Sequence, residues 1–543
     1  MSRYTYERLS AQDAGFLWTE TPNQPMHVGG VAVLEAGPHN REDGSIDIDA
    51  YRRHVESVLH WIPRYRQKIE WTPIEGWPVW IDDRQFDIGH HIRHIALPRP
   101  GTTAQLKELA ARINARRLDR RHALWEIWVI EGVAGGEQFA LLNKIHHCMI
   151  DGAAGADLSQ ILMSPSARIE PVDAVPYLPR QPPTRSELLR DAIALSVERP
   201  LAFARGALSA MLQNGGAESK GAADPHESAD HLTLAQRAWS MRHLFKYATS
   251  RASETPLNGE LGPHRRIEWL TMPLEDVKDL RQVLDCTVND VVLATVTEAV
   301  RRYLFRRRVD HRQIVFRVAA PVSMRRPEHD RRQGNHVSSW VVPLPLDLEG
   351  PLDQLAAIRE ETLALKESDA ALALDSVMQI AEWLPGPLLA RGLRAIESSG
   401  PVNMIVTNVP GPQFPLYFSG ARLLALYPIV PLIPGGGLGV ALFSYEGKLC
   451  WGFNGDFELV PDLAAFVDDV RAAFERLRQA AVSSYIERRT APDEQPIPSS
   501  SRAEKSAARL PHPATEPTQP RGPELASAAP EDPPVEPDLA LSA

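Results

Sequence analysis

The chain has 543 residues, of which 43% are hydrophobic and 24% charged, with 59 basic side chains against 69 acidic ones. The resulting net charge of −10 argues against a dedicated nucleic-acid-binding protein, which would carry a basic balance. The three cysteines, Cys148, Cys286 and Cys450, lie far apart and form no C-x-x-C pair, which excludes a disulfide-dense secreted fold and the usual structural zinc frameworks. We therefore expect a cytoplasmic protein built from more than one globular unit.

Strand and helix patterns alternate in the first part of the chain, which we assign to a first half over residues 1–164. Apolar runs predict strands at 31–34, 125–130 and 139–145. The spacing of apolar residues predicts an amphipathic helix over 104–115. The amino terminus lacks the apolar region of a signal peptide, so none is expected.

A change of composition marks a connection over residues 165–254. It opens with a proline-rich stretch and continues with a predicted helix over 186–212 that breaks near Pro200. Residues 215–230 are polar. We expect this segment to join two globular halves.

The second half, residues 255–486, repeats the mixture of patterns. Helices are predicted at 288–305 and 352–366, a strand at 314–320, and a β-rich hairpin region over 424–451 with a tight turn at Glu446-Gly447. The segment from Leu423 to Tyr445 is uncharged and long enough to cross a bilayer. Its prolines and glycines would break a helix repeatedly, so we interpret it as two buried strands joined by a glycine turn, with no transmembrane segment.

The last residues, 487–543, form a tail rich in proline, serine, alanine and glutamate. From Ala491 onward it holds nine acidic and four basic residues. Such a composition buries too little apolar surface to offset the entropy of ordering a chain, so we expect a disordered tail.

The sharpest local motif follows directly after the predicted strand at 139–145 and reads His-His-Cys-Met-Ile-Asp-Gly over residues 146–152. A histidine at a strand end is well placed to project into a cleft, and its near-neutral pKa suits it to accept a proton from a hydroxyl group. Asp151 and Gly152 are expected to shape the turn. By itself the motif also fits a paired loop histidine beside a turn-forming Asp-Gly. A metal site is not indicated, because no H-E-x-x-H or similar ligand set accompanies the pair.

In its context this motif resembles the HHxxxDG signature of the CoA-dependent acyltransferase superfamily, to which chloramphenicol acetyltransferase and peptide-synthetase condensation domains belong. Over residues 9–480 the chain is similar to the bacterial wax ester synthase/diacylglycerol acyltransferase family. An ordered set of further stretches carries this likeness: 9–13, 21–30, 124–126, 262–266, 287–290, 321–325, 334–335 and 408–412. Ala123 stands where the family usually has proline, a departure that would affect a turn rather than the chemistry.

The resemblance implies an α/β fold with mixed sheets. Two chloramphenicol-acetyltransferase-like halves would form a pseudo-dimer, with the active site in a tunnel between them. His147 would act as the general base that takes the proton of an acceptor hydroxyl as its oxygen attacks an acyl-CoA thioester. His146 would support it, and Asp151 would orient the loop through an arginine partner that the sequence does not identify.

The resemblance leaves the oxyanion donor open. Asn289, beside Asp290 at the start of a predicted helix, is the best side-chain candidate for stabilising the thioester oxyanion. The same pair equally fits a helix cap. No G-x-S-x-G elbow and no G-x-G-x-x-G fingerprint occurs, so neither a serine hydrolase nor a dinucleotide site is expected.

Three functional hypotheses follow. The first is a triacylglycerol-forming enzyme using long-chain acyl-CoA and diacylglycerol, with wax ester synthesis from fatty alcohols as the close variant. The second is a non-catalytic lipid-binding or lipid-droplet protein of the same fold, since a fold does not fix function. The third is transfer to an amine or a carrier-bound substrate. No cofactor is expected, because acyl-CoA is a substrate, and we expect peripheral contact with the inner membrane leaflet or lipid inclusions.

Overall fold

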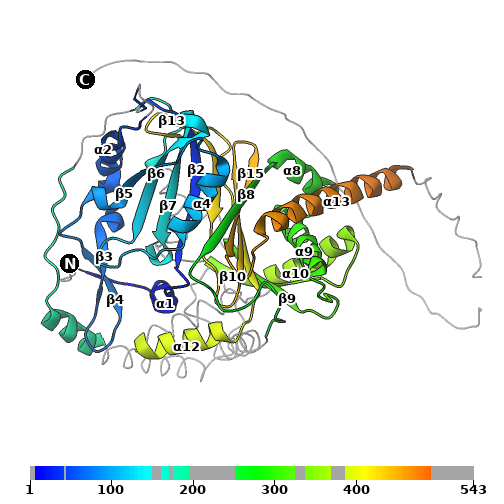
Figure 1. The fold of residues 1–543 in the computed structure, drawn as a ribbon. Coiled ribbons are helices and arrows are strands. Elements are labelled where there is room, and N and C mark those ends of the chain that lie inside the picture. The colour runs from blue at the N-terminus through cyan, green and yellow to red at the C-terminus, as the bar shows by residue number, and fades with distance from the viewer. Residues whose placement is uncertain are drawn as a thin grey trace, which may run out of the picture. The chain divides into compact units, whose positions relative to one another are not determined.

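The computed structural model describes residues 6–38, 40–41, 45–149, 161–169, 175–195, 251–323, 337–367 and 386–490 (Figure 1). Internal contacts divide the chain into two units, Met1–Arg489 and Thr490–Ala543. The predicted tail from residue 491 onward lies outside the described residues, as do 196–250 of the predicted connection.

A six-stranded mixed sheet forms the core of the first half. Its strand order is β12 (Tyr417–Phe418), β13 (Ala421–Ile429), β2 (His27–Glu35), β7 (Gln138–His146), β6 (Trp125–Val133) and β5 (Ile92–Ala96). β2 and β7 are antiparallel, β7 and β6 are antiparallel, and β6 and β5 are parallel.

A second six-stranded sheet repeats this pattern. Its order is β10 (Val337–Leu344), β9 (Phe316–Ser323), β11 (Met404–Val409), β14 (Leu438–Tyr445), β15 (Lys448–Asp456) and β8 (Arg265–Pro273). β8 and β15 are antiparallel, β15 and β14 are antiparallel, and β14 and β11 are parallel. The four strands β2, β7, β6 and β5 therefore correspond to β8, β15, β14 and β11, which confirms the prediction of two similar mixed halves.

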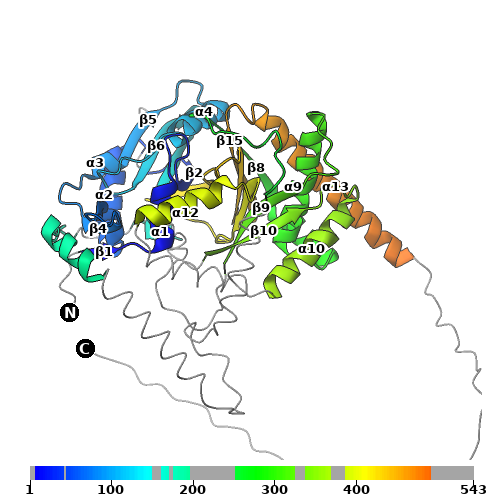
Figure 2. The ribbon, with the colours of Figure 1, turned by 90° about the horizontal axis from the view of Figure 1, so that it is seen from below.

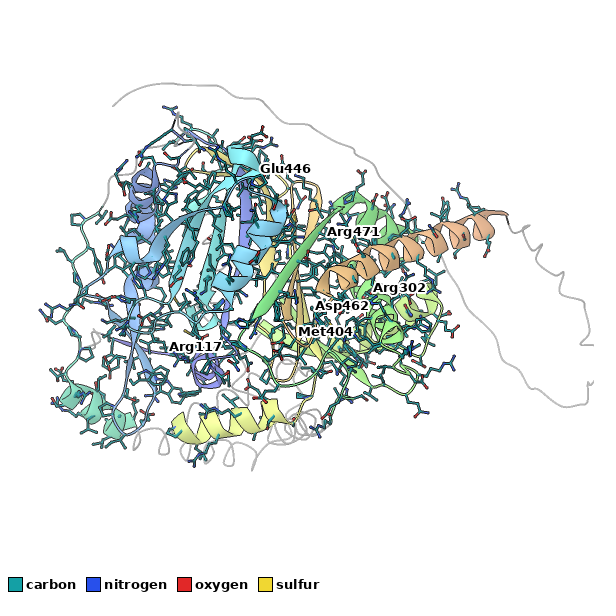
Figure 3. All side chains as sticks on the ribbon, viewed as in Figure 1. Arg117, Arg302, Met404, Glu446, Asp462 and Arg471 are labelled. Carbon is teal, nitrogen blue, oxygen red and sulfur yellow. The ribbon has the colours of Figure 1, made fainter. Side chains whose placement is uncertain are left out.

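Helices bury the apolar faces of the two sheets. In the second half, α8 (Leu274–Val283), α9 (Val288–Arg306), α10 (Pro351–Glu367) and α13 (Leu463–Thr490) share one core with the sheet. Figure 3 labels Met404 of β11, which is buried, and Arg471 of α13, which is exposed. The α9 helix begins with a capping box in which Thr287 and Asp290 satisfy each other's backbone N–H groups.

In the first half, α2 (Ile48–Val58) and α1 (Ala11–Thr19) share a core with one face of the sheet, and α4 (Thr103–Asn114) shares a core with the other. A small sheet of β1 (Glu7–Arg8), β4 (Pro78–Asp82) and β3 (Gln67–Trp71) flanks this half, and α3 (Ile88–His91) precedes β5. The α12 helix (Gly386–Ser398) lies beside α1 (Figure 2).

The two halves meet where α4 contacts β8 and where β13 contacts β14 and β15. Lys107 on α4 forms an ion pair with Glu268 on β8 and lies over the ring of Trp269. β13 comes from the second half of the chain but pairs with β2 of the first sheet. This strand therefore joins the two halves through backbone hydrogen bonds.

The predicted elements are largely present. Strands at 31–34, 125–130 and 139–145 lie in β2, β6 and β7, and the helices at 104–115, 288–305 and 352–366 are α4, α9 and α10. The strand at 314–320 begins two residues later than predicted, as β9. The described part of the connection is helical over 185–195. α13 continues to Thr490, past residue 486, where the second half was predicted to end.

The uncharged segment differs from the prediction of one hairpin region. Glu446 and Gly447, with φ values of 44° and 73°, form the tight turn between β14 and β15 as predicted. β13 and β14, however, belong to different sheets. The prolines and glycines between them let the chain cross from one sheet to the other. No helix among the described residues has the length and apolar character needed to cross a membrane.

Candidate active site

The histidine pair lies at the end of a central strand. β7 ends at His146, which pairs in register with His27 at the start of β2. His147 opens a single 3-10 turn, His147–Met149, so its backbone leaves the sheet directly after the last ladder position. Asp151 and Gly152 lie outside the described residues, so their predicted roles stay predictions.

Two contacts from the amino-terminal segment hold His147. Its backbone N–H donates to the carbonyl oxygen of Met26 at 2.8 Å. Its imidazole stacks on the ring of Phe16 from α1, with ring centroids 3.9 Å apart and planes 21° apart. Such a stack restricts rotation of the imidazole, while the backbone bond fixes where the residue leaves the strand.

The environment keeps His147 unprotonated. Burial lowers its pKa to about 4, and the charge of a protonated His146 would lower it further, while its own backbone carbonyl acts in the opposite direction. The Nδ1 atom is buried and makes no hydrogen bond of ordinary geometry to the described residues. At neutral pH the ring is therefore a free base, the form needed to accept a proton.

His146 is buried, with 1% of its side chain exposed. Its Nδ1 accepts the backbone N–H of Cys148 at 3.2 Å and lies 3.1 Å from Cys148 Sγ. Because Nδ1 is an acceptor, the proton of the neutral ring is on Nε2. That atom lies 3.6 Å from Glu20 Oε1, outside hydrogen-bond range but within that of an ion pair. Burial lowers the pKa of His146, although Glu20 acts in the opposite direction.

Glu20 and Arg120 complete this region. Arg120 donates through Nη2 and Nε to Glu20 Oε2 at 2.8 and 3.2 Å. The other oxygen, Oε1, accepts the backbone N–H of Met26 at 3.2 Å. Burial alone would raise the pKa of Glu20, but the neighbouring His146 and Arg120 outweigh it and lower that pKa to about 2. The carboxylate is thus ionised at neutral pH.

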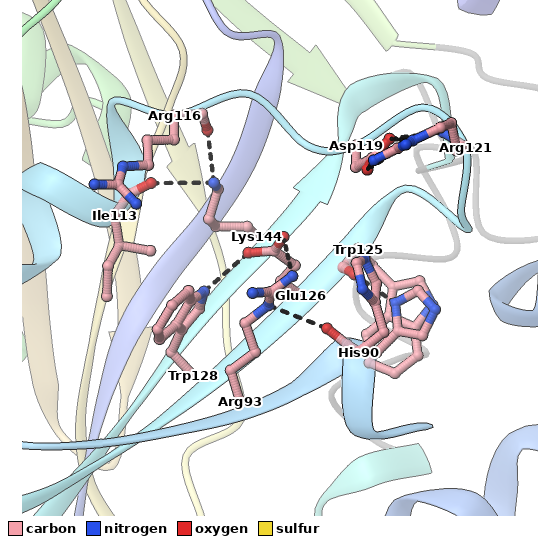
Figure 4. Close-up of polar contacts among 11 residues, drawn as sticks. His90, Arg93, Ile113, Arg116, Asp119, Arg121, Trp125, Glu126, Trp128 and Lys144 are labelled. Atoms are coloured by element: carbon pink, nitrogen blue, oxygen red, sulfur yellow. Dashed lines mark hydrogen bonds and ion pairs between the residues drawn. The ribbon is translucent and has the colours of Figure 1, made fainter. Parts of the chain in front are cut away.

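A layer of buried polar groups extends from this region along the sheet. Lys144, two residues before His146 on the same face of β7, donates to the carbonyl oxygens of Ile113 and Arg116 at the end of α4 (Figure 4). A cation at a helix carboxyl terminus satisfies carbonyls that have no partner within the helix. The next helical residue, Asn114, accepts a hydrogen bond from His27 at 2.8 Å.

Asn289 lies elsewhere. It is the second residue of α9, and its Oδ1 accepts a hydrogen bond from Asn408 Nδ2 at 2.9 Å. Both residues line a cavity of about 120 Å³ in the second half, together with apolar side chains and Lys366. The helix cap is supplied by Thr287 and Asp290 rather than by Asn289. The structure therefore brings Asn289 to Asn408; its role as an oxyanion donor stays a prediction.

Sequence reasoning missed Phe16, Glu20 and Arg120. Glu20 and Arg120 are 100 residues apart, and the motif that names the histidines contains none of the three. The available signal was one charged residue, Glu20, two positions after the apolar Gly15–Phe16–Leu17–Trp18 run of α1. Among the described residues, no group of three or more His, Cys, Asp or Glu side chains is arranged to hold a metal ion.

Comparison with known proteins agrees with this geometry. A paired histidine at the end of a central strand, in a fold of two equivalent mixed sheets, is the arrangement expected of an acyl-CoA-dependent acyltransferase. The model of the wax ester synthase/diacylglycerol acyltransferase catalytic domain matches residues 9–292, and that of the family's C-terminal domain matches residues 333–478. The chain belongs to the wax ester synthase/diacylglycerol acyltransferase family.

Individual relatives extend over nearly the whole chain. A putative diacylglycerol O-acyltransferase of Mycobacterium bovis is 32% identical over 492 residues, covering 89% of this chain and 98% of the relative. A putative diacylglycerol O-acyltransferase of Mycobacterium tuberculosis is 30% identical, covering 88% and 91%. The solved wax ester synthase/diacylglycerol acyltransferase of Marinobacter aquaeolei VT8 shares the fold, with a TM-score of 0.59 at 22% identity, covering 88% of this chain and 100% of that one.

Proposed function

We propose that the protein transfers a long-chain acyl group from acyl-CoA to the hydroxyl group of diacylglycerol, giving triacylglycerol and free CoA. Family membership and the names of the mycobacterial relatives support this reaction. The observation that carries it is His147, an imidazole held by a ring stack and a backbone hydrogen bond, with a pKa lowered to about 4.

His147 serves as a general base in this proposal. Because Nδ1 is buried, we assign proton transfer to Nε2. Nε2 accepts the proton of the acceptor hydroxyl as the oxygen attacks the thioester carbonyl, and a tetrahedral oxyanion forms. The carbon–sulfur bond then breaks, and the protonated imidazole returns the proton to the CoA thiolate. A positioned base contributes roughly 10² to 10⁴ in rate.

Diacylglycerol is favoured as the acceptor over a long-chain fatty alcohol. The mycobacterial relatives, at 30–32% identity, carry the name diacylglycerol O-acyltransferase, whereas the solved neighbour with both activities in its name is 22% identical. Both acceptors present one hydroxyl group to the same base. Wax ester synthesis is therefore the alternative, and a comparison of the two acceptors must distinguish it from triacylglycerol synthesis.

We also propose that the protein works at the surface of the inner membrane leaflet or of lipid inclusions. Diacylglycerol and long-chain acyl-CoA both partition into lipid surfaces, so an enzyme acting on them meets its substrates there. Co-sedimentation of the purified protein with diacylglycerol-containing vesicles tests this placement. Recovery of all the protein in the supernatant would contradict it.

The reaction is tested by thiol release from palmitoyl-CoA, with diacylglycerol and hexadecanol offered separately. We expect release that depends on diacylglycerol and is lost in His147→Ala. His94→Ala is the matched control, because His94 is an exposed histidine of the same half that pairs with Glu131. Release with hexadecanol alone would assign wax ester synthesis. Lipid binding without release from either acceptor would favour the non-catalytic hypothesis, and release with an amine acceptor alone would favour the condensation-type hypothesis.

A further inference from the structure

We infer that Glu20, anchored by Arg120, is the positioning residue that sets the orientation of His147. The inference rests on the proposed function and adds to it a residue from outside the histidine motif. Glu20 is the residue that follows α1, and its side chain reaches both sides of the histidine turn. It acts through other residues and makes no contact with the reacting atoms in this proposal.

The first route from Glu20 to His147 runs through Met26. Glu20 Oε1 accepts the Met26 N–H at 3.2 Å, and the Met26 carbonyl accepts the His147 N–H at 2.8 Å. Glu20 thus accepts the backbone N–H of Met26, and His147 donates to the carbonyl oxygen of the same residue. A shift of Glu20 moves the segment to which the His147 backbone is bonded.

The second route runs through His146. Its Nε2 faces Glu20 at 3.6 Å, while its Nδ1 accepts the N–H of Cys148 at 3.2 Å. Met26 therefore accepts the N–H of His147 itself, and His146 accepts the N–H of the next residue, Cys148. Because a carboxylate only accepts protons, it favours the tautomer of His146 with the proton on Nε2, which leaves Nδ1 free for Cys148.

The third route runs through α1. The Glu20 N–H donates to the Phe16 carbonyl at 3.2 Å and closes the helix, and the Phe16 ring stacks on His147. Arg120 joins these parts, because its Nη2 donates to the Leu17 carbonyl at 2.7 Å as well as to Glu20 Oε2. Glu20 is therefore linked to α1, which carries the Phe16 ring, to Met26, which accepts the His147 N–H, and to His146.

Glutamine at position 20 would disturb this arrangement without changing the volume of the side chain. Its amide NH₂ group would face either Arg120, itself a donor, or Met26 N–H and His146 Nε2–H, which are also donors. One donor–donor conflict is unavoidable around the Glu20 side chain, of which 1% is exposed. Glu298, a buried carboxylate of the second half, offers a matched control, because it pairs with Arg301 at 2.8 Å and Arg476 at 2.6 Å.

The kinetic test compares Glu20→Gln with Glu298→Gln in the palmitoyl-CoA assay. Misplacement of a catalytic group by about 1 Å costs on the order of 10²-fold, so we expect kcat of Glu20→Gln to fall by about 10²-fold with little change in KM for palmitoyl-CoA. Glu298→Gln should keep kcat per folded molecule. Arg120→Lys, which keeps the charge, should retain more activity than Arg120→Met. Equal kcat losses in Glu20→Gln and Glu298→Gln would overturn the inference.

A second measurement does not depend on activity. Amide hydrogen exchange of the segment ending at Met149 should become faster at His147 and Cys148 in Glu20→Gln and stay unchanged in Glu298→Gln, since these two N–H groups bond to Met26 and His146. Unchanged exchange would overturn the inference even if the enzyme is active. Faster exchange in Glu20→Gln, together with a wild-type protein that releases no CoA, would support the positioning contacts and reject the proposed reaction.

Discussion

Two equivalent strands, one in each half of the molecule, end in different ways. β7 and β15 each occupy the same place in a mixed sheet, antiparallel to both neighbours. β15 ends at Asp456, which is fully buried and accepts the N–H groups of Gly262, Glu458 and Leu459 at 2.8 to 3.2 Å. Arg265, its register partner on β8, completes the set with an ion pair at 3.3 Å.

β7 ends instead with polar atoms that lack such partners. His146 Nε2 and His147 Nδ1 are both buried without an ordinary hydrogen bond to the described residues. Buried polar groups in folded proteins are usually paired, and exceptions concentrate where function requires them. In the proposed reaction, the strand end that stabilises the fold in the second half corresponds to the one that carries the general base in the first half.

The largest expected effect of a single substitution is on turnover. His147→Ala should lower acceptor-dependent CoA release by roughly 10² to 10⁴, the contribution of a positioned general base. Its free energy of unfolding should change little, because the ring is half-buried and makes no hydrogen bond of ordinary geometry to the described residues. Parallel urea titrations and rate measurements separate the two quantities. A loss of stability that accounts for the whole loss of rate would contradict this assignment.

The opposite result is expected at the end of β15. Asp456→Asn leaves the buried guanidinium of Arg265 without its charge partner, and breaking such a pair destabilises a protein by about 3 to 5 kcal/mol. Turnover per folded molecule should be retained. Urea unfolding gives the first quantity, and rate per unit of folded protein gives the second. A fall of turnover in Asp456→Asn as large as that in His147→Ala would show that the end of β15 also contributes to turnover and not to stability alone.

The sequence predicted one strand end and not the other. The histidine pair was identified because it directly follows an apolar strand and its pattern resembles a known motif. Asp456 carries no such signal, since a lone aspartate after a strand is an ordinary turn residue. Its importance depends on Gly262 and Arg265, which are nearly two hundred residues away.

The same distinction holds for the fold. Elements fixed by local chemistry were predicted, such as the Glu446-Gly447 turn and the α9 helix that Thr287 caps. The placement of β13 in the first sheet depends on pairing with β2, about 390 residues earlier, and no local pattern encodes it. Glu20 and Arg120 were missed for the same reason.

The start of β2 offers a prediction of intermediate size that concerns pH. Burial lowers the pKa of His27 to about 3, with the charge of Lys144 acting in the same direction. Because the pKa in the folded state is below that of an ordinary histidine, about 6.5, protonation favours unfolding. The stability contributed by neutral His27 is complete above pH 6.5 and is lost as pH falls toward 3.

His27→Gln tests this dependence, since glutamine does not titrate and its amide can still donate to Asn114. Between pH 7.5 and 5, wild type should lose about 2 kcal/mol more of its free energy of unfolding than the variant. Urea titrations at the two pH values measure the difference. Arg265, in the corresponding register position of β8, does not titrate in this range and sets no such dependence. Equal acid losses in wild type and variant would contradict the assignment.

Asn289 lines a cavity of the second half together with Asn408. An oxyanion donor lost by substitution costs about 10²- to 10³-fold in kcat. If Asn289 is the predicted donor, Asn289→Ala should lower kcat by that amount. If its hydrogen bond to Asn408 in the cavity of the second half is its main role, the loss should stay below about tenfold. Asn408→Ala is the matched variant, and the double variant should cost no more than either alone, because the two amides share one hydrogen bond. A loss of the larger size in Asn289→Ala alone would assign the oxyanion to this residue, and would mean that both halves supply catalytic groups.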